Sequence, residues 1–351
     1  MKAKDLARQL GVSPATISLV LNNKPGISDT LRRSLLKKIR ELGCGDMIGA
    51  AQDSGNYASQ RPHPVIAYLI YTSCDETDDR FAFYPAVLEG AEMEARENGF
   101  HLVVMHLSRQ GNPQLQSLLE DVGDTAGVII QAGHISAGIL EDVRSLRIPA
   151  VFVDAYLPNR QISSVCVNNE QGVFSAVRYL KEKGHRDLGY VYSGQENDSQ
   201  VDRRRCFHQA LWEYGLEDRK EFYFSCADLH FGSSADELSL RFQKVKPFPT
   251  ALLAENDHLA WQAIKALEQA GLRVPEDVSV IGFDNRSLCT MITPRLTSMK
   301  NSRRLMGREC ISLLQNLCRL RRLGIYDACL NYQISTQLIE RDSVRDLTKT
   351  T

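Results

Sequence analysis

Several charged and polar side chains stand directly after short apolar runs that predict buried strands. Asp154 ends the run AVFVD, Gln131 ends GVIIQ, and Asp284 ends VIGFD. Asn256 follows ALLAE, and Arg203 opens a predicted helix after a loop rich in Ser, Gly and Asn. Ligands of open parallel sheets bind outside the carboxyl ends of the strands, so we expect these side chains to gather at one cleft.

Carboxylates, amides and an arginine at such a cleft suit a polyol or a sugar, because hydroxyl groups both donate and accept hydrogen bonds. Phe83, Tyr84 and Phe231 could add ring faces that stack on the ligand. Asp257 and Asn285 share the same edge. The alternative is that Asp and Asn at strand ends only cap the helices that follow. Convergence of about five such groups favours a ligand site.

Motifs of catalysis are missing from the sequence. HExxH, GxSxG, a P-loop and a GxGxxG after a strand do not occur. Glu182 and His185 lie at the end of a predicted helix, where surface capping residues are a better interpretation than an acid–base pair. We therefore expect a binding protein and not an enzyme.

The number and spacing of the cysteines indicate the redox compartment of the protein and whether it binds a metal. The nine cysteines are scattered singly, with no CxxC pair, which is typical of a reduced, cytoplasmic protein and predicts neither disulfides nor a metal site. Met1 leads straight into a predicted helix without a signal-peptide pattern, and no apolar run approaches the ~20 residues of a membrane span. We expect a cytoplasmic protein with no membrane partner, no metal and no cofactor.

The first 44 residues predict a head of three short helices. Gly11 ends the first helix, Ser13 is an N-cap type, and Pro14 occupies the first position of the second helix, where its missing N–H is harmless. Ser28 opens a third helix with a cationic polar side. A helix, a short turn with Gly and a helix with small, hydroxylated N-terminal residues form the helix-turn-helix layout that reads a DNA major groove.

Charge favours DNA binding over the alternative of a three-helix bundle that binds no nucleic acid. Residues 1–44 hold nine Lys and Arg, Lys4 among them, against three Asp and Glu, which gives +6. The whole chain is −1, so the remainder carries −7. A basic head on an acidic body is expected when one domain contacts phosphates and the other must not.

After residue 64, apolar runs alternate with amphipathic segments. Repeated strand–helix units imply parallel sheets, and more than two hundred residues of them suggest two lobes. Residues 45–64 change to Gly, Ala, Ser, Asn and Gln and predict a linker. The expected fold class is α/β, with a helix-turn-helix head and a two-lobed parallel-sheet body. The predicted strands are 65–71, 101–107, 127–131, 150–154, 187–193, 250–255 and 278–284, and the predicted helices are 82–98, 171–183, 202–214 and 257–270.

The run VSPATISLVLN, followed by a basic helix that ends in ELG, resembles the signature of the LacI (lactose-repressor) family of bacterial transcription regulators. The resemblance implies that the head residues at the DNA are Ser13, Pro14, Ala15, Thr16, Ser18, Leu19 and Asn22. Of these, Pro14, Ala15 and Leu19 would face bases. Members often carry Arg where this chain has Leu19, and apolar residues can contact only thymine methyls, so we expect little direct base readout.

The resemblance is weakest in the linker. Family members usually carry an Ala-Arg pair and a Leu two residues on, in a hinge helix whose leucine enters the minor groove. Here the arginine position falls on Ala51 and the leucine position on Asp53. Phosphates repel an aspartate, which cannot unstack a base step, so we expect a flexible linker or a hinge helix with different chemistry.

The body resembles the LacI-family effector domain, itself similar to periplasmic sugar-binding proteins, through landmarks such as DRRRCFHQAL and DVSVIGFDN. Cys206 replaces a usual glycine, and Glu255 sits where a small residue is common. The resemblance implies three crossings between lobes, with lobe 1 at 65–166 and 299–325, lobe 2 at 167–298 and 326–343, and a tail at 344–351. The effector contacts it implies are Asp154, Arg203, Asn256 and Asp284, with Gln131, Val167 and Arg303 lining the pocket.

The expected function is that of a ligand-controlled transcription regulator, a repressor in particular. A single helix-turn-helix reads one half-site, so a homodimer on a near-palindromic double-stranded operator is expected. The effector is expected to be a small, sugar-like molecule. The alternative is a sugar-binding sensor or carrier with weak or no specific DNA binding, which the altered linker keeps open.

Replacing Asp53 with Leu should tighten operator binding, because a leucine can wedge between base pairs, whereas an aspartate is repelled by the flanking phosphates and cannot unstack a base step. We expect an affinity gain of about tenfold, which corresponds to about 1.4 kcal/mol. Fluorescence anisotropy with a labelled operator at fixed salt measures the gain. Asp53→Asn is the matched control, since it removes the charge without adding a wedge. Equal affinities of the two variants would contradict the wedge argument.

Overall fold

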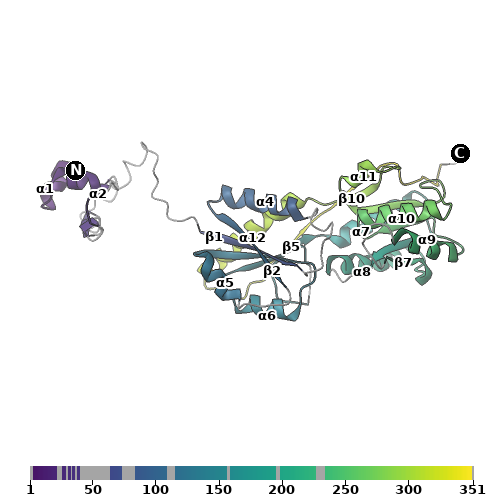
Figure 1. Ribbon diagram of the computed structural model, residues 1–351, viewed down its shortest axis with the longest axis horizontal. Helices are drawn as coiled ribbons and strands as arrows, with labels where there is room; N and C mark the ends of the chain where they lie inside the picture. The colour runs from purple at the N-terminus through teal and green to yellow at the C-terminus, as the bar shows by residue number, and fades with distance from the viewer. Residues whose placement is uncertain are drawn as a thin grey trace. The chain divides into compact units, whose positions relative to one another are not determined.

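The computed structural model describes residues 3–21, 26–28, 31–32, 34–35, 38–39, 64–72, 84–108, 115–155, 159–194, 198–226 and 234–349. They fall into two compact units, Met1–His63 and Pro64–Thr351 (Figure 1). The predicted linker positions Ala51 and Asp53, the DNA contact Asn22, and the rings of Phe83 and Phe231 lie outside the described residues. Among the described residues, no helix has both the length and the apolar character that a membrane crossing requires.

The first unit has the predicted helix-turn-helix start. Helix α1 (Ala3–Gln9) and helix α2 (Pro14–Leu21) are separated by a turn in which Gly11 has a φ of +67°, a left-handed conformation that favours glycine. Their apolar faces pack together with two residues from further along the unit. This small core consists of Leu6, Ala7, Ile17, Val20, Leu21, Leu35 and Ile39.

The first sheet of the second unit defines lobe 1. Its strand order is β11-β5-β4-β3-β1-β2, and all neighbours are parallel. The strands are β1 (Val65–Thr72), β2 (His101–Ser108), β3 (Thr125–Ala132), β4 (Ala150–Val153), β5 (Ser164–Val167) and β11 (Asn331–Ile334). Along β1 alternate side chains enter different cores: Ile66 and Tyr68 join the core that includes helices α4 (Tyr84–Glu97) and α12 (Arg303–Arg322), whereas Ala67 and Leu69 face α5 (Leu115–Val122) and α6 (Ala137–Ser145).

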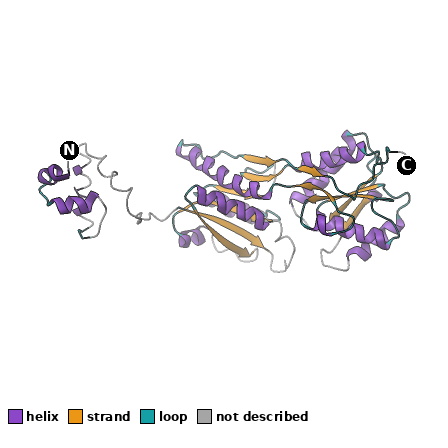
Figure 2. Cartoon of the chain, turned by 90° about the horizontal axis from the view of Figure 1, so that it is seen from above, coloured by secondary structure: helices purple, strands orange, loops and turns teal. Residues whose placement is uncertain are grey.

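The second sheet defines lobe 2, with the order β12-β10-β9-β8-β6-β7. Its neighbours are parallel except for β12, which runs antiparallel to β10. Helices α7 (Asn169–Glu182) and α8 (Asp198–Glu213) join one core, while α9 (Ser234–Lys244) and α10 (Asp257–Gln269) join the other. In each lobe the strands lie between helices (Figure 2). The remaining elements are β6 (Leu188–Ser193), η3 (Lys220–Phe222), β7 (Tyr223–Cys226), β8 (Ala251–Ala254), β9 (Ser279–Asp284), α11 (Leu288–Met291), β10 (Thr297–Lys300) and β12 (Gln337–Ile339).

Strand pairing corrects two of the expected lobe boundaries. Met299 was expected to begin the return to lobe 1, but it lies in β10 and pairs with β9, so the chain crosses only after Lys300. Residues 326–343 were expected to belong to lobe 2, which is wrong for β11, because that strand pairs with β5 of lobe 1. Strand β11 alternates exposed and half-buried residues and lacks the apolar run that identified the other strands.

His185 is also corrected. It was expected to be a surface capping residue, but its side chain is buried. Nδ1 lies 3.0 Å from Thr250 Oγ1, and Nε2 lies 3.1 Å from both the Arg345 carbonyl oxygen and Ser279 Oγ. Burial lowers the pKa of His185. The imidazole therefore joins the C-terminal segment to the sheet of lobe 2.

The backbones of α4 and α12 touch where the two helices cross. A Cβ atom at Gly90 would lie 2.0 Å from the Arg304 carbonyl oxygen, and one at Gly307 would lie 1.9 Å from the Val87 carbonyl oxygen. No side chain fits at either position, because the obstacle is backbone. Ion pairs close the crossing at its rim, including Arg304 to Glu89 at 2.8 Å.

Gly307→Ala should destabilise the body, because the added methyl group must push two helix backbones apart. Overpacking of this kind costs about 1–3 kcal/mol. Urea unfolding followed by circular dichroism measures the change in free energy of unfolding. Ser312→Ala in the same helix is the control and should change stability by less than about 0.5 kcal/mol. A Gly307→Ala protein as stable as the control would contradict this packing.

Candidate functional site

The predicted strand-end residues lie where both sheets present their carboxyl edges. Asp154 follows β4 with a φ of +59°, and Asp284 ends β9 with a φ of +103°. Together with Asn285, at +50°, they are the non-glycine residues of positive φ in the described part of the chain. Such conformations cost about 1–3 kcal/mol each and cluster at ligand sites. The backbone is therefore strained at the two carboxylates that the sequence singles out.

Arg203 is the centre of this region. Its side chain is 4% exposed and leaves α8 toward the strand ends. Nε donates to Asn169 Oδ1 at 2.9 Å, and Nη1 donates to the Glu255 carbonyl oxygen at 2.6 Å. Nη2 lies 3.3 Å from Asp284 Oδ1, and the guanidinium sits 3.9 Å from the centroid of the Phe283 ring. These contacts surround the guanidinium group of Arg203 and fix it in one orientation.

Asp284 links lobe 2 to the segment that crosses into lobe 1. Besides Arg203, its Oδ1 accepts a hydrogen bond of 2.8 Å from Nδ2 of Asn301, which lies between β10 and α12. Burial raises the pKa of Asp284, while the positive charges of Arg203, Arg286 and Arg303 oppose the rise. Arg303, the first residue of α12, thus acts on this carboxylate through its charge.

Asp154 brings lobe 1 into the same site. Tyr84, at the start of α4, donates its hydroxyl to Asp154 Oδ2 at 3.4 Å. Burial raises the pKa of Asp154 to about 7, with Arg203 lowering it and Asp284 raising it further. Those influences reach across the lobes, so the carboxyl edges of the two sheets face one another. Tyr84, Asp154, Arg203 and Asp284 are the predicted residues that the structure brings together.

Three buried oxygens at this site have no hydrogen-bond partner: Asp154 Oδ1, Asn301 Oδ1 and Glu255 Oε1. Leaving a buried polar group unpaired costs about 1–3 kcal/mol. Burial raises the pKa of Glu255 to about 8, so the acid is largely protonated at neutral pH. Glu255 Oε2 accepts the Ser193 N–H at 2.9 Å, so a proton on Oε1 is free to be donated. Asn301 Oδ1 can only accept, an ionised Asp154 accepts and a protonated Glu255 donates, so the site suits a ligand that both donates and accepts hydrogen bonds.

Other predicted residues are already engaged. Asn256 Oδ1 accepts the Leu259 N–H at 2.9 Å as the N-cap of α10, so the capping alternative holds for this oxygen. Gln131 Oε1 accepts the Tyr68 hydroxyl at 2.9 Å. Val167 is buried at the end of β5. No direct hydrogen bond among the described residues joins these side chains to Arg203, and their place in the lining of an effector pocket stays a prediction.

Asp257 and Asn285 hold the loop after β9. Asp257 accepts the Arg286 N–H at 2.6 Å and the Ser298 hydroxyl at 2.5 Å. Asn285 Oδ1 accepts from Arg341 at 2.6 Å. Both residues follow strands as expected, but their polar atoms fix the loop that positions Asp284.

The strand-end rule missed two polar residues of the site. Asn169 follows β5 after Asn168, and Asn301 follows β10 directly. Neither strand was predicted, because SVCV and TSMK contain polar residues and do not form the fully apolar run seen in the equally short β4 and β8. Once these strands are known, the same rule finds both asparagines.

A second connection between the lobes lies at the start of α8. Asp198 Oδ1 is 3.0 Å from His134 Nδ1, and Asp198 Oδ2 accepts the Ile135 N–H at 3.0 Å. The Asp198 N–H donates to the Gly133 carbonyl oxygen at 3.1 Å. The loop after β3 in lobe 1 is therefore hydrogen-bonded to the start of α8 in lobe 2, beside the site.

In the head, the N-terminus of α2 is formed as predicted. Ser13 Oγ accepts the Thr16 N–H at 3.0 Å and lies 2.8 Å from the Thr16 hydroxyl. Ser13, Pro14, Ala15 and Ser18 are exposed. Small, exposed residues at this end leave room for the helix to approach the base edges of a major groove.

Two further predicted DNA contacts can be placed in part. Leu19 is half-buried, and its carbonyl oxygen accepts from Arg32 Nη1 at 2.9 Å. Lys4 lies in α1, and its side chain is outside the described set. The Leu19 side chain offers no hydrogen bond to a base edge, and little direct base readout stays a prediction.

Two family models match the chain. The model of bacterial regulatory proteins of the lacI family matches residues 2–43, and the model of a periplasmic binding protein-like domain matches residues 177–344. The HTH-type transcriptional repressor CytR of Escherichia coli (strain K12) is 26% identical over 347 residues, which cover 98% of this chain and 96% of CytR.

Solved structures of the same architecture also match. The transcriptional regulator CelR in complex with cellobiose aligns with a TM-score of 0.67 at 25% identity, over 98% of this chain and 99% of CelR. The lac repressor dimer bound to operator and the anti-inducer ONPF aligns with a TM-score of 0.69 at 22% identity, over 98% of this chain and 99% of that one. The second likeness is one of fold.

Glu255→Gln should make the protein more stable at alkaline pH. The folded protein keeps the Glu255 proton up to about pH 8, whereas an unfolded glutamate loses it near pH 4. The unfolded chain binds fewer protons between these values, so the stability that protonated Glu255 contributes is lost as the pH rises from about 4 to about 8.

The advantage of Glu255→Gln over the unmodified protein should grow by at least about 1 kcal/mol between pH 5 and pH 8, since one pKa unit corresponds to about 1.4 kcal/mol. Urea unfolding at several pH values measures it. Glu268→Gln, at an exposed glutamate, is the control and should follow the unmodified protein. A Glu255→Gln curve parallel to the control would show that Glu255 is ionised throughout.

Proposed function

The chain belongs to the lacI family of bacterial regulatory proteins and carries a periplasmic binding protein-like effector domain, and from this we propose how it works. A hydroxyl-rich, sugar-like effector that binds between the lobes controls the binding of the protein to an operator. The chain acts on DNA as a homodimer, because one helix-turn-helix reads only one half-site of a near-palindromic sequence. Regulation is repressive, in keeping with the similarity to the repressor CytR over nearly the whole chain.

The observation that carries the effector proposal is the unpaired polar atoms around Arg203. Asp154 from lobe 1 and Asn301 from the crossing segment each leave an acceptor oxygen buried, and protonated Glu255 leaves a donor. Hydroxyl groups satisfy both kinds of partner, whereas a purely apolar ligand satisfies neither. The complex of CelR with cellobiose supports a sugar as the ligand class.

Effector binding favours the arrangement in which both lobes face the ligand. A ligand shifts a conformational equilibrium only as far as its affinities for the two states differ. An effector that bonds Asp154 in lobe 1 and Asp284 in lobe 2 has such a difference, because separating the lobes breaks one set of bonds. Coupling of about 1–3 kcal/mol changes DNA affinity about 5- to 150-fold.

Helix α12 is placed to carry this shift. Its first residue, Arg303, acts on Asp284, and its later residues Leu314 and Arg319 line a cavity together with Pro64, which directly precedes β1. The helix therefore reaches from the effector site to the edge where the chain leaves for the head. A change in lobe closure would move α12, and with it the joint of the head.

Selection of bound DNA fragments, with and without a panel of mono- and disaccharides, tests the proposal as a whole. We expect one near-palindromic sequence to be enriched and at least one sugar to change its binding. Enrichment of no DNA at low salt would instead favour a sugar sensor with weak DNA binding, an alternative supported by the Ala51 and Asp53 linker chemistry.

Asp284→Asn tests the site. The change keeps the size of the side chain but removes the charge that pairs with Arg203, so half-maximal response should require at least about tenfold more sugar. Operator affinity without sugar should be unchanged. Anisotropy titration of the operator complex measures both, with exposed Asp277→Asn as the control. Loss of DNA binding with an intact sugar response would show that Asp284 is misassigned.

A further inference from the structure

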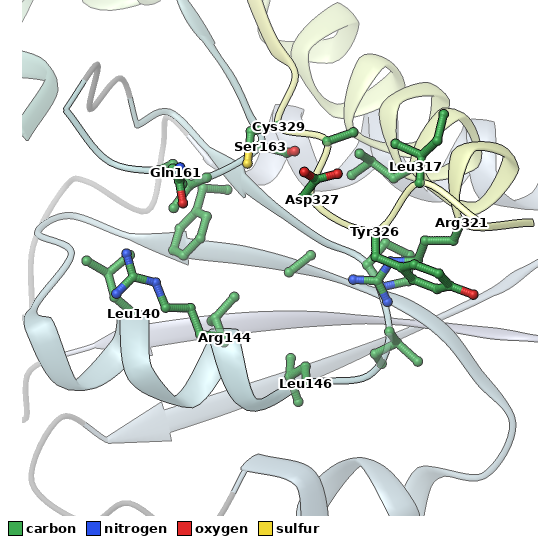
Figure 3. Close-up of a pocket in the computed structure, with 18 residues that line it drawn as sticks. Leu140, Arg144, Leu146, Gln161, Ser163, Leu317, Arg321, Tyr326, Asp327 and Cys329 are labelled. Atoms are coloured by element: carbon green, nitrogen blue, oxygen red, sulfur yellow. The ribbon is translucent and has the colours of Figure 1, made fainter. Parts of the chain in front are cut away.

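The last turn of α12 gathers arginines at the amino-terminal edge of the lobe 1 sheet. Arg319 and Arg322 are exposed and line a cavity of about 520 Å³ with Pro64, Phe100 and Asp124. Across the helix, Arg321 lines a second cavity, of about 400 Å³, which it shares with Arg144 of α6 (Figure 3). We refer to Arg144, Arg319, Arg321 and Arg322 as the arginine edge.

This concentration of positive charge opposes the charge of the body, since residues 45–351 sum to −7. At the other end of the same helix, arginines are neutralised: Arg304 pairs with Glu89, and Arg308 with Glu94 and Glu97. Within the described residues, Arg319 and Arg322 form no ion pair. Asp124 and Asp327 each line one of the cavities without pairing with these arginines.

Helix-dipole stabilisation accounts for part of this cluster. Cations in the last turn of a helix offset the helix dipole, which stabilises by about 0.3–1 kcal/mol per residue. That effect explains one or two such residues. It does not explain why two arginines in the first half of α12 are paired with carboxylates, whereas Arg319 and Arg322 in its last turn are not paired in the described part of the chain.

The covalent joint to the head lies at the same edge. Pro64 immediately precedes β1 and lines the cavity with Arg319 and Arg322. Any DNA held by the head is thereby tethered to this edge of the body, and tethering raises the effective concentration of the second contact. Arginine suits that contact, because its planar guanidinium bonds phosphate oxygens in pairs.

We propose that the arginine edge contacts the phosphates of operator DNA next to the half-site read by the head. The proposal rests on the proposed function and adds a second DNA-binding surface to it. The contacts carry no sequence information, so they add affinity and salt dependence rather than specificity. They also offset the small base-reading capacity of Pro14, Ala15 and Leu19.

The test compares the full-length protein with Arg319→Gln/Arg322→Gln on the selected operator, by anisotropy between 50 and 200 mM salt. We expect binding at the low-salt end to weaken about tenfold, and the slope of log affinity against log salt to become shallower by about 0.9 for each phosphate that the variant no longer neutralises. Two duplexes are used: one ends at the operator, and the other extends about ten base pairs on each side. The affinity gained from the extension should disappear in the variant.

Arg178→Gln/Arg304→Gln is the matched control, because it changes the net charge equally at exposed arginines elsewhere in the body. It should retain the steep salt slope and the gain from the longer duplex. Equal slopes for the two double variants, or a full gain from the extension in Arg319→Gln/Arg322→Gln, would overturn the proposal. Failure of the unmodified protein to bind any duplex at 50 mM salt is a different result, which would overturn the regulator function itself.

Discussion

The buried ion pair of Arg203 and Asp284 fixes the geometry on which the site depends. A charge taken out of water must be met by partners, or it costs several kcal/mol. Arg203 is met by the Asp284 carboxylate, the Glu255 carbonyl oxygen and Asn169. Those partners belong to β9, to the end of β8 and to α7, so one side chain holds three elements of lobe 2 in register around the site.

Lobe 1 contributes the complementary half. Asp154 reaches the same site in a strained backbone conformation, and its pKa of about 7 reflects burial that the charge of Arg203 only partly offsets. Strain, burial and an unpaired oxygen are unfavourable in the free protein, and a ligand that donates hydrogen bonds relieves part of that cost. Asn301, which bonds Asp284, lies directly before α12, so a ligand at the site acts on the segment that leads into this helix. Helix α12 in turn packs against α4, and the two backbones are in contact.

Much of this was predictable from local patterns. Apolar runs located the central strands to within about two residues, and Ser13 with Pro14 located the start of α2, because a strand buried on both faces and a helix cap each leave a short-range signature. Strands β5, β7, β10, β11 and β12 were not recognised. Each contains a polar residue within its three or four positions, unlike the equally short but wholly apolar β4 and β8, and its pairing partner lies elsewhere in the sequence, as in the pairing of β11 with β5.

The sequence alone determined which residue types stand at the carboxyl ends of the strands, because strand ends are marked by where apolar runs stop. Only the tertiary structure decided which polar atoms there remain available. Asn256 and Gln131 have an oxygen occupied by a helix cap and by Tyr68, whereas Asp154 and Asn301 keep one unpaired. The reason is that hydrogen-bond partners are supplied by neighbouring elements whose positions depend on long-range packing. Buried His185 shows the same limit, since its three partners come from distant segments.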